Sequence, residues 1–207
     1  MDRLSVEGTK RKILEASIDL FSRKGYSAVS VRELTKAVGI KESSLYNHFR
    51  SKEEILELIY QVFKAEHDLA LPSMDKLPII AKNTTIEKFL LDGMESFKKS
   101  VADELHEKMW RILNIEQFRD QRAREIILNQ VYKRTIDFLE HAFQAFMNEN
   151  KLKQGNTRML AIQYQYPIFT MITEYLLVKY DDNDTTDVEN KMNEHLQYFL
   201  QYININS

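Results

Sequence analysis

The fold is decided by residues 29–56, whose sequence is VSVRELTKAVGIKESSLYNHFRSKEEIL. Ser30 followed three residues later by Glu33 has the form of a capping box, in which each residue satisfies a backbone N–H of the first turn. A helix of about two turns is therefore expected over residues 31–38. Gly39 then supplies the left-handed backbone that a sharp turn requires.

A second, shorter helix is expected over residues 42–48, with Leu45 and Phe49 on its buried side. Nearly all of its other side chains are hydrogen-bond donors or acceptors. A helix this short and polar is poorly stable alone, so the surrounding structure must hold it in place. Lying in a major groove, it would bring Lys41 and Asn47 to base edges or phosphates. The alternative is a plain three-helix subdomain whose second helix is simply solvated.

A second capping box, at residues 51–54, begins a longer helix. Lys52 stands in its first turn, where acidic residues are usually preferred. A phosphate bound at this helix N-terminus would explain the lysine. Before the motif, residues 9–24 form another expected helix, which ends at Gly25. Residues 1–8 are expected to be a disordered arm, with contact between Arg3 and DNA as the alternative.

The composition favours long helices. The chain of 207 residues has only 3 prolines and 5 glycines, so long stretches contain no helix breaker. It has no cysteine, which excludes disulfides and thiolate metal sites. No segment is of signal-peptide type or offers about 18 uncharged apolar residues for a membrane span. We expect an all-α protein of about nine helices, located in the cytoplasm, with no membrane association.

Charge is unevenly distributed along the chain. Residues 1–52 hold 11 Lys and Arg against 6 Asp and Glu, a net charge of +5. The remainder holds 18 against 25, a net charge of −7. A basic N-terminal part on an acidic body is typical of a protein that binds a polyanion at one end only.

The boundary between two domains is expected near the helix that starts at Lys52. Residues 1–52 form the helix-turn-helix domain, with the start of the connecting helix, and residues 53–207 form a C-terminal helical domain. The connecting helix is expected to continue to about residue 70. Residues 71–83, with Pro72 and Pro78, are expected to form a loop.

The expected helices of the C-terminal domain begin at residue 86, cover residues 103–115 and 119–149, and end with residues 156–180 and 187–203. Helix 156–180 is apolar on two sides about 200° apart. Leu160, Tyr164, Ile168, Met171, Tyr175 and Val178 form one stripe; Ile162, Tyr166, Phe169, Thr173, Leu176 and Tyr180 form the other. A helix of this kind must be covered from both sides, by its own domain and by a partner subunit. The pattern does not distinguish which stripe faces the partner, and Pro167 is expected to loosen the helix.

Residues 9–56 resemble the DNA-binding domain of the TetR family of bacterial regulators. The resemblance is carried by Phe21-x-x-x-Gly25-Tyr26, by the segments 29–34 and 37–40, and above all by residues 45–54, LYNHFRSKEE. It implies phosphate contacts by Ser30, Tyr46, His48 and Lys52, and base or mixed contacts by Arg32, Lys41, Ser43, Ser44 and Asn47. Lys41 and Ser43 depart from the usual serine or threonine and glycine, so the operator sequence cannot be copied from a relative.

The same resemblance implies an all-α homodimer that represses transcription by occupying a palindromic operator in double-stranded DNA. A small-molecule inducer bound in the C-terminal domain would release the DNA. The candidate pocket residues are aromatic or methionine: Phe97, Met109, Trp110, Phe118, Tyr132, Phe143, Tyr164 and Phe169. The candidate dimer residues lie on the last two helices: Tyr175, Val178, Met192, Leu196, Phe199 and Ile203. If Glu95, Glu116, Glu140 or Glu174 faces the pocket, a cationic lipophilic inducer is expected; otherwise an acyl chain or neutral aromatic fits better.

Other classes of function have less support. The sequence shows no nucleotide-binding loop, no activated nucleophile and no paired-carboxylate motif, so an enzyme is not expected. The histidines have no ligand spacing, and neither a metal site nor a cofactor is expected. Arg119, Arg122 and Arg124 suggest a phosphate site, but the interleaved acids favour a salt-bridged face. A remaining alternative is a DNA-binding protein of the same fold with a structural or global role and no inducer.

Overall fold

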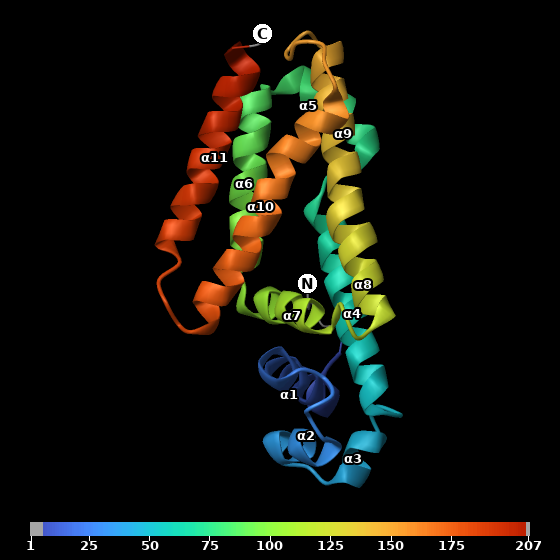
Figure 1. Cartoon of the computed structure of the whole chain (residues 1–207). Coiled ribbons are helices and arrows are strands. Elements are labelled where there is room, and N and C mark those ends of the chain that lie inside the picture. The colour runs from blue at the N-terminus through green and yellow to red at the C-terminus, as the bar shows by residue number, and fades with distance from the viewer. Residues whose placement is uncertain (1–5, 206–207) are drawn as a thin grey trace. The chain divides into compact units, whose positions relative to one another are not determined.

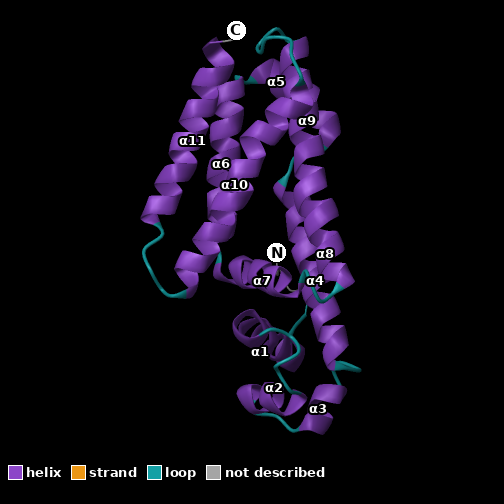
Figure 2. Cartoon of the chain, in the orientation of Figure 1, coloured by secondary structure: helices purple, strands orange, loops and turns teal. Residues whose placement is uncertain are grey.

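The computed structural model describes residues 6–205, and side chains up to Ile203. Over these residues every regular element is helical and none is a strand, as Figure 2 shows. This confirms the predicted all-α fold. Arg3, the candidate DNA contact of the N-terminal arm, lies outside the described residues. No helix of the described chain is both long and apolar enough to cross a membrane.

The chain folds as two compact units that differ from the predicted division at residue 52. One contains Met1–Ala70 and Ser100–Val131, and the other Leu71–Lys99 and Tyr132–Ser207. We call them the first and the second unit. The first unit joins the helix-turn-helix to helices from the middle of the chain, because α7 (Glu104–Glu116) packs against both α1 (Gly8–Lys24) and α4 (Lys52–Ala70).

The first unit begins with a three-helix head made of α1, α2 (Val31–Val38) and α3 (Glu42–Tyr46), seen in blue in Figure 1. Its core is built from fully buried side chains of each helix and of the segment after α3: Ile13, Leu14, Phe21, Leu34, Leu45 and Phe49. The unit also contains α4, α7, α8 (Gln121–Glu125) and most of the helical segment η2 (Ile126–Lys133).

The single tryptophan of the chain, Trp110, lies on the face of α7 that packs on α4. Its side chain is only 7% exposed. The ring centroid lies 5.8 Å from that of Phe63 and 5.8 Å from that of His106, in both cases edge to face. Edge-to-face packing is a preferred arrangement of aromatic rings, so this cluster fixes α7 against α4.

The second unit contains the short helix η1 (Met74–Lys76), α5 (Leu77–Asn83), most of α6 (Ile86–Ala102), α9 (Arg134–Asn148), α10 (Thr157–Tyr180) and α11 (Thr186–Ile205). Helix α10 packs against α9 and α11, and α5 packs against α9. The core is aromatic at its centre, where the ring of Phe199 lies 6.0 Å from Phe143 and 5.1 Å from Tyr164.

The prediction of a loop over residues 71–83 is wrong from Met74 onward, where the chain forms η1 and α5. Pro78 stands in the first turn of α5, where proline is tolerated because its missing N–H would have no helical partner. Leu77 and Ala81 bury one side of the helix. Lys151 donates from Nζ to the carbonyl oxygens of Ala81, Lys82 and Thr84, at 2.7–2.8 Å, and so closes its C-terminal end.

The single helix predicted over residues 119–149 is present as three consecutive segments, α8, η2 and α9. The middle one is wound as a π-helix, a rare form that is frequent at functional sites. Helix α10 continues from Thr157 to Tyr180 through Pro167.

Candidate DNA-binding site

The helix-turn-helix is positioned by the local contacts that the sequence predicts. Ser30 Oγ accepts the Glu33 N–H at 3.1 Å, which confirms the Ser30 half of the first capping box, and the Glu33 carboxylate pairs with Lys24. Gly39 has φ 75° and ψ 33°, the left-handed turn expected between α2 and α3. At the start of α4, Ser51 Oγ accepts the Glu54 N–H at 3.2 Å, and Glu54 accepts the Arg50 N–H at 2.6 Å.

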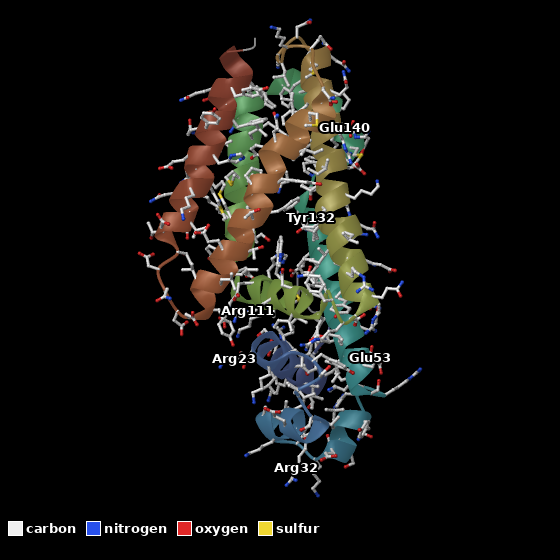
Figure 3. The ribbon with its side chains drawn as sticks, in the orientation of Figure 1. Arg23, Arg32, Glu53, Arg111, Tyr132 and Glu140 are labelled. Atoms are coloured by element: carbon white, nitrogen blue, oxygen red, sulfur yellow. The ribbon has the colours of Figure 1, made fainter. Side chains whose placement is uncertain are left out.

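The described head presents most of the predicted DNA contacts on its surface. Leu45 and Phe49, 0% and 1% exposed, anchor α3 from its inner side. The exposed predicted contacts are Ser30, Arg32, Lys41, Ser43, Tyr46 and Asn47, and Ser44 and His48 are half-buried. Figure 3 shows Arg32 at the outer side of the head, on the helix before α3. Helix α3 is thus short, polar outside and fixed inside, as a helix that enters a major groove must be.

Lys52, a predicted phosphate ligand, makes contacts inside the first unit. Its Nζ donates to the carbonyl oxygens of Tyr26 and Val29, at 2.8 and 2.7 Å, and lies 4.0 Å from the centre of the Tyr26 ring. Burial lowers the pKa of Lys52. The ammonium group therefore fixes the loop between α1 and α2 to the first turn of α4.

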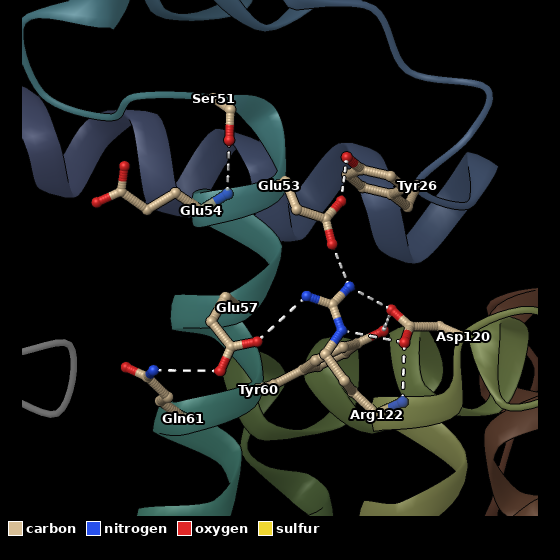
Figure 4. A network of polar contacts seen from close by, with 9 residues as sticks. All are labelled: Tyr26, Ser51, Glu53, Glu54, Glu57, Tyr60, Gln61, Asp120 and Arg122. Carbon is tan, nitrogen blue, oxygen red and sulfur yellow. Dashed lines mark hydrogen bonds and ion pairs between the residues drawn. The ribbon is translucent and has the colours of Figure 1, made fainter.

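A polar network joins α4 to α8 behind the head, as Figure 4 shows. The guanidinium of Arg122 contacts Glu53, Glu57 at 3.2 Å and Asp120 at 2.6 Å. The hydroxyl of Tyr60 donates to Asp120 at 3.3 Å. Hydrogen bonding to Asp120 raises the pKa of Arg122, which keeps it charged. The predicted salt-bridged face is present at Arg122, but two of its partners come from α4, far away in the sequence.

A cavity of about 230 Å³ lies beside this network in the first unit. It is lined by Glu57, Tyr60, Lys64, Arg122, Glu125, Ile126, Asn129 and Gln130. These residues were not predicted as a site, because they come from three segments that are separated in the sequence: α4, α8 and the π-helical segment. The change from α-helical to π-helical winding at Ile126 marks this place in the structure, but no sequence pattern indicates it.

The predicted ligand-pocket residues are divided between the two units. Met109, Trp110 and Phe118 belong to the first unit, whereas Phe97, Tyr132, Phe143, Tyr164 and Phe169 belong to the second. Within the second unit, Tyr132 and Phe169 are in ring contact at 4.7 Å, and Tyr132 is 39% exposed. Phe118 is 85% exposed, and Met109 and Phe143 are fully buried in core packing.

Each of the four acids considered for a pocket has a partner. Glu95, Glu140 and Glu174 pair with Lys99, Arg158 and Lys191 at 2.8–2.9 Å. Glu116 accepts the backbone N–H of Tyr26 at 2.8 Å. Among the described residues, no group of His, Asp and Glu has an arrangement that suits a metal ion.

The predicted dimer residues require a correction. Tyr175, Met192, Leu196, Phe199 and Ile203 are 2–7% exposed, because they pack inside the second unit of one chain; Val178 is half-buried. Side chains enclosed within one subunit cannot form the surface that a partner covers. The outer faces of α10 and α11 instead expose a different apolar set: Tyr166, Leu177, Tyr180, Tyr198 and Tyr202.

The capped α2, the glycine turn and the buried anchors of α3 define a helix-turn-helix protein of all-α fold. Residues 13–59 match the family described as bacterial regulatory proteins, tetR family. The biofilm operon icaADBC negative transcriptional regulator IcaR of Staphylococcus epidermidis is 48% identical over 46 residues, which are 22% of this chain and 25% of that protein. The match thus spans about a quarter of the relative's length.

Two solved structures have the same fold over nearly the whole chain. A putative TetR-family transcriptional regulator from Mesorhizobium loti has a TM-score of 0.65 at 17% identity, covering 94% of this chain and 96% of that one. A complex of SmeT, from Stenotrophomonas maltophilia, with triclosan has a TM-score of 0.68 at 17% identity, covering 95% and 91%. The DNA-binding domain of this chain therefore belongs to the TetR family, and the whole chain has the fold of TetR-family regulators.

Proposed function

We propose that this chain is a transcriptional repressor that binds a palindromic operator as a homodimer and is released by a small hydrophobic ligand. The observation that carries the proposal is the exposed, polar α3, anchored from inside by Leu45 and Phe49 in a TetR-family domain. Repression is supported by the relative IcaR, which is a negative transcriptional regulator. Two recognition helices then lie in successive major grooves, about 34–36 Å apart.

In this proposal, DNA contacts follow the exposed face of the head. Tyr46 and His48 bind backbone phosphates, Arg32 and Asn47 reach base edges, and Lys41 makes a mixed contact with a base edge and a phosphate. The hydroxyls of Ser30, Ser43 and Ser44 add short-range hydrogen bonds. Lys52 has a structural role in this proposal, because it fixes the loop after α1 to α4. Exposed cations of the head contact the phosphates in its place.

The proposed dimer surface is the exposed side of α10 and α11. Leu177 is 66% exposed and Tyr198 is 72% exposed, fractions that are large for apolar and aromatic side chains. Together with Tyr166, Tyr180 and Tyr202 they would lose contact with water if a second copy covered them. The ligand is proposed to bind in the second unit, where the accessible ring of Tyr132 lies against Phe169. The complex of SmeT with triclosan shows that a protein of this fold can hold a hydrophobic aromatic compound.

A genome-wide binding profile, followed by electrophoretic mobility shift at moderate salt, tests the function. One or two bound sites close to the chain's own gene support a local repressor. Dozens of dispersed sites support the alternative of a structural role without an inducer. If the chain binds no DNA sequence more tightly than bulk DNA, neither function holds. Binding that depends on charge alone does not select a site. A thermal-shift ligand screen on the same protein, repeated with Tyr132→Ala, then tests the ligand site.

A further inference from the structure

Glu116, the last residue of α7, is a buried carboxylate with a specific partner in the head. Its side chain is 2% exposed, and Oε1 accepts the backbone N–H of Tyr26 at 2.8 Å. A buried carboxylate is costly unless it is hydrogen-bonded, and an apolar side chain would fill the same space at lower cost. The carboxylate of Glu116 therefore holds the loop between α1 and α2 through the Tyr26 N–H.

The backbone at this point approaches α7 without an intervening side chain. Gly25 has φ 78° and ψ 156°, a conformation that is essentially restricted to glycine. A Cβ on Gly25 would lie 3.2 Å from Glu116 Oε1 and 3.3 Å from Ile115 Cγ2. Glycine therefore serves both the conformation of the loop and its close contact with α7.

Tyr26 makes further contacts with α4 and, indirectly, with α8. Its hydroxyl donates to Glu53 Oε2 at 2.6 Å, and its carbonyl oxygen accepts from Lys52 at 2.8 Å. Glu53 in turn pairs with Arg122 of α8. In Figure 4 the Tyr26 hydroxyl, the Glu53 carboxylate and the Arg122 guanidinium follow one another in a continuous line. Three helices outside the head are thus connected at a single residue of the loop.

A second polar contact joins α7 to the head. Lys108 donates to Asp19 of α1 at 2.8 Å, and this hydrogen bond lowers the pKa of Asp19. Lys108 precedes Glu116 by eight residues, which is about 12 Å along a helix. Two contacts at separate points of one helix fix the rotation of the head on α7 as well as its distance.

From these contacts we infer that Glu116, acting through Tyr26, is a positioning residue that sets the orientation of the head on α7 for operator binding. The inference rests on the proposed function, since it concerns the simultaneous binding of two half-sites. A full operator engages two heads and is sensitive to the orientation of each. An isolated half-site engages one head and is not.

The test compares the affinities of variants for a full site, selected from random DNA by the wild-type chain, and for its isolated half-site. Glu116→Ala is expected to weaken full-site binding about tenfold, equivalent to about 1.4 kcal/mol, and to leave half-site binding unchanged. Glu116→Gln keeps an oxygen that accepts the Tyr26 N–H, so near wild-type binding is expected. Glu125→Ala, the same change at an exposed position on α8, is the control and is expected to behave as wild type.

Two results overturn the inference: wild-type affinity of Glu116→Ala for the full site, or an equal loss on the half-site, which would indicate general damage to the head. If Glu116→Ala does not fold, Asp19→Ala removes the second contact instead, and the same pattern of loss is expected. Hydrogen exchange of the Tyr26 amide tests its contact with Glu116 directly. This test holds even if the chain selects no DNA and the proposed function fails. Protection present in wild type and Glu116→Gln but lost in Glu116→Ala supports it; equal protection in all three overturns it.

Discussion

At the scale of single residues, Lys52 makes internal contacts, with the carbonyl oxygens of Tyr26 and Val29. We predict that Lys52→Ala lowers the free energy of unfolding by about 1–3 kcal/mol, since two carbonyl oxygens lose a charged donor. The slope of log affinity against log salt should stay unchanged. Chemical unfolding and a salt titration of DNA binding measure the two quantities.

The control for this prediction is Lys41→Ala, at an exposed position at the start of α3. It should leave stability unchanged and lower the salt slope by about 0.9, the change for one phosphate contact. The opposite pattern, in which Lys52→Ala lowers the slope and leaves stability intact, would restore Lys52 as a phosphate ligand.

The two glycines with positive φ on either side of α2 should respond differently to alanine. At Gly39, φ is 75° and a Cβ would meet no atom within 4 Å, so Gly39→Ala should cost about 1–2 kcal/mol for the left-handed backbone. At Gly25, a Cβ would also be too close to Glu116, so Gly25→Ala should cost more. Equilibrium unfolding of both variants checks the order, and an equal cost would show that α7 does not crowd Gly25.

The residue scale also shows what the sequence can predict about this site. The cap between Ser30 and Glu33 was predictable because both partners are three residues apart. The contact of Lys52 with Tyr26 and Val29 spans more than twenty residues, so no local pattern indicates it. Glu116 and Tyr26 are 90 residues apart, and their contact depends wholly on how α7 packs on the head.

At the scale of elements, two substitutions at the end of α3 should have different effects, one on affinity for all DNA and the other on sequence specificity. Tyr46 is 51% exposed at the end of the helix, and Tyr46→Ala is predicted to weaken binding to all DNA sequences alike, as loss of a phosphate contact does. Asn47→Ala is predicted to alter base preference by about 1–3 kcal/mol at the contacted position. Binding to a panel of single-base operator variants measures both effects. Unchanged affinity of Tyr46→Ala would contradict the proposed docking.

Most helices were predictable from the periodicity of apolar residues. The helices that were missed or differ in winding have physical causes. Helix α5 was missed because Pro78 looks like a breaker, although the first turn of a helix accepts proline. The π-helical segment before α9 has an ordinary apolar pattern, and this pattern does not indicate its wider turns. The two apolar sides of α10 were visible, but only packing showed which side faces the core of the second unit.

At the scale of the whole molecule, dimerisation should depend on the exposed side of α10. Leu177→Glu places a charge on the proposed surface and is predicted to give a monomer with an unchanged helical circular dichroism spectrum. Sedimentation velocity measures the mass in solution. Leu69→Glu is the matched control, because Leu69 is 86% exposed on α4 of the first unit, and it should remain dimeric. A dimer that survives Leu177→Glu would place the interface elsewhere.

The division into two units was beyond what sequence patterns reveal. The basic charge of residues 1–52 and the capping box at Ser51 favoured a boundary there. In the structure α7, from the middle of the chain, completes the first unit by packing on α1 and α4. Such pairing between distant segments follows from the shapes of buried surfaces, to which charge and helical period are insensitive.

The place of Trp110 has a practical consequence. Its indole is the only one in the chain and lies on α7, with Phe63 and the imidazole of His106 as neighbours. Excitation of tryptophan therefore reports on a single buried point, six residues before Glu116. Emission wavelength and intensity should change whenever α7 moves on α4, with no label attached to the protein.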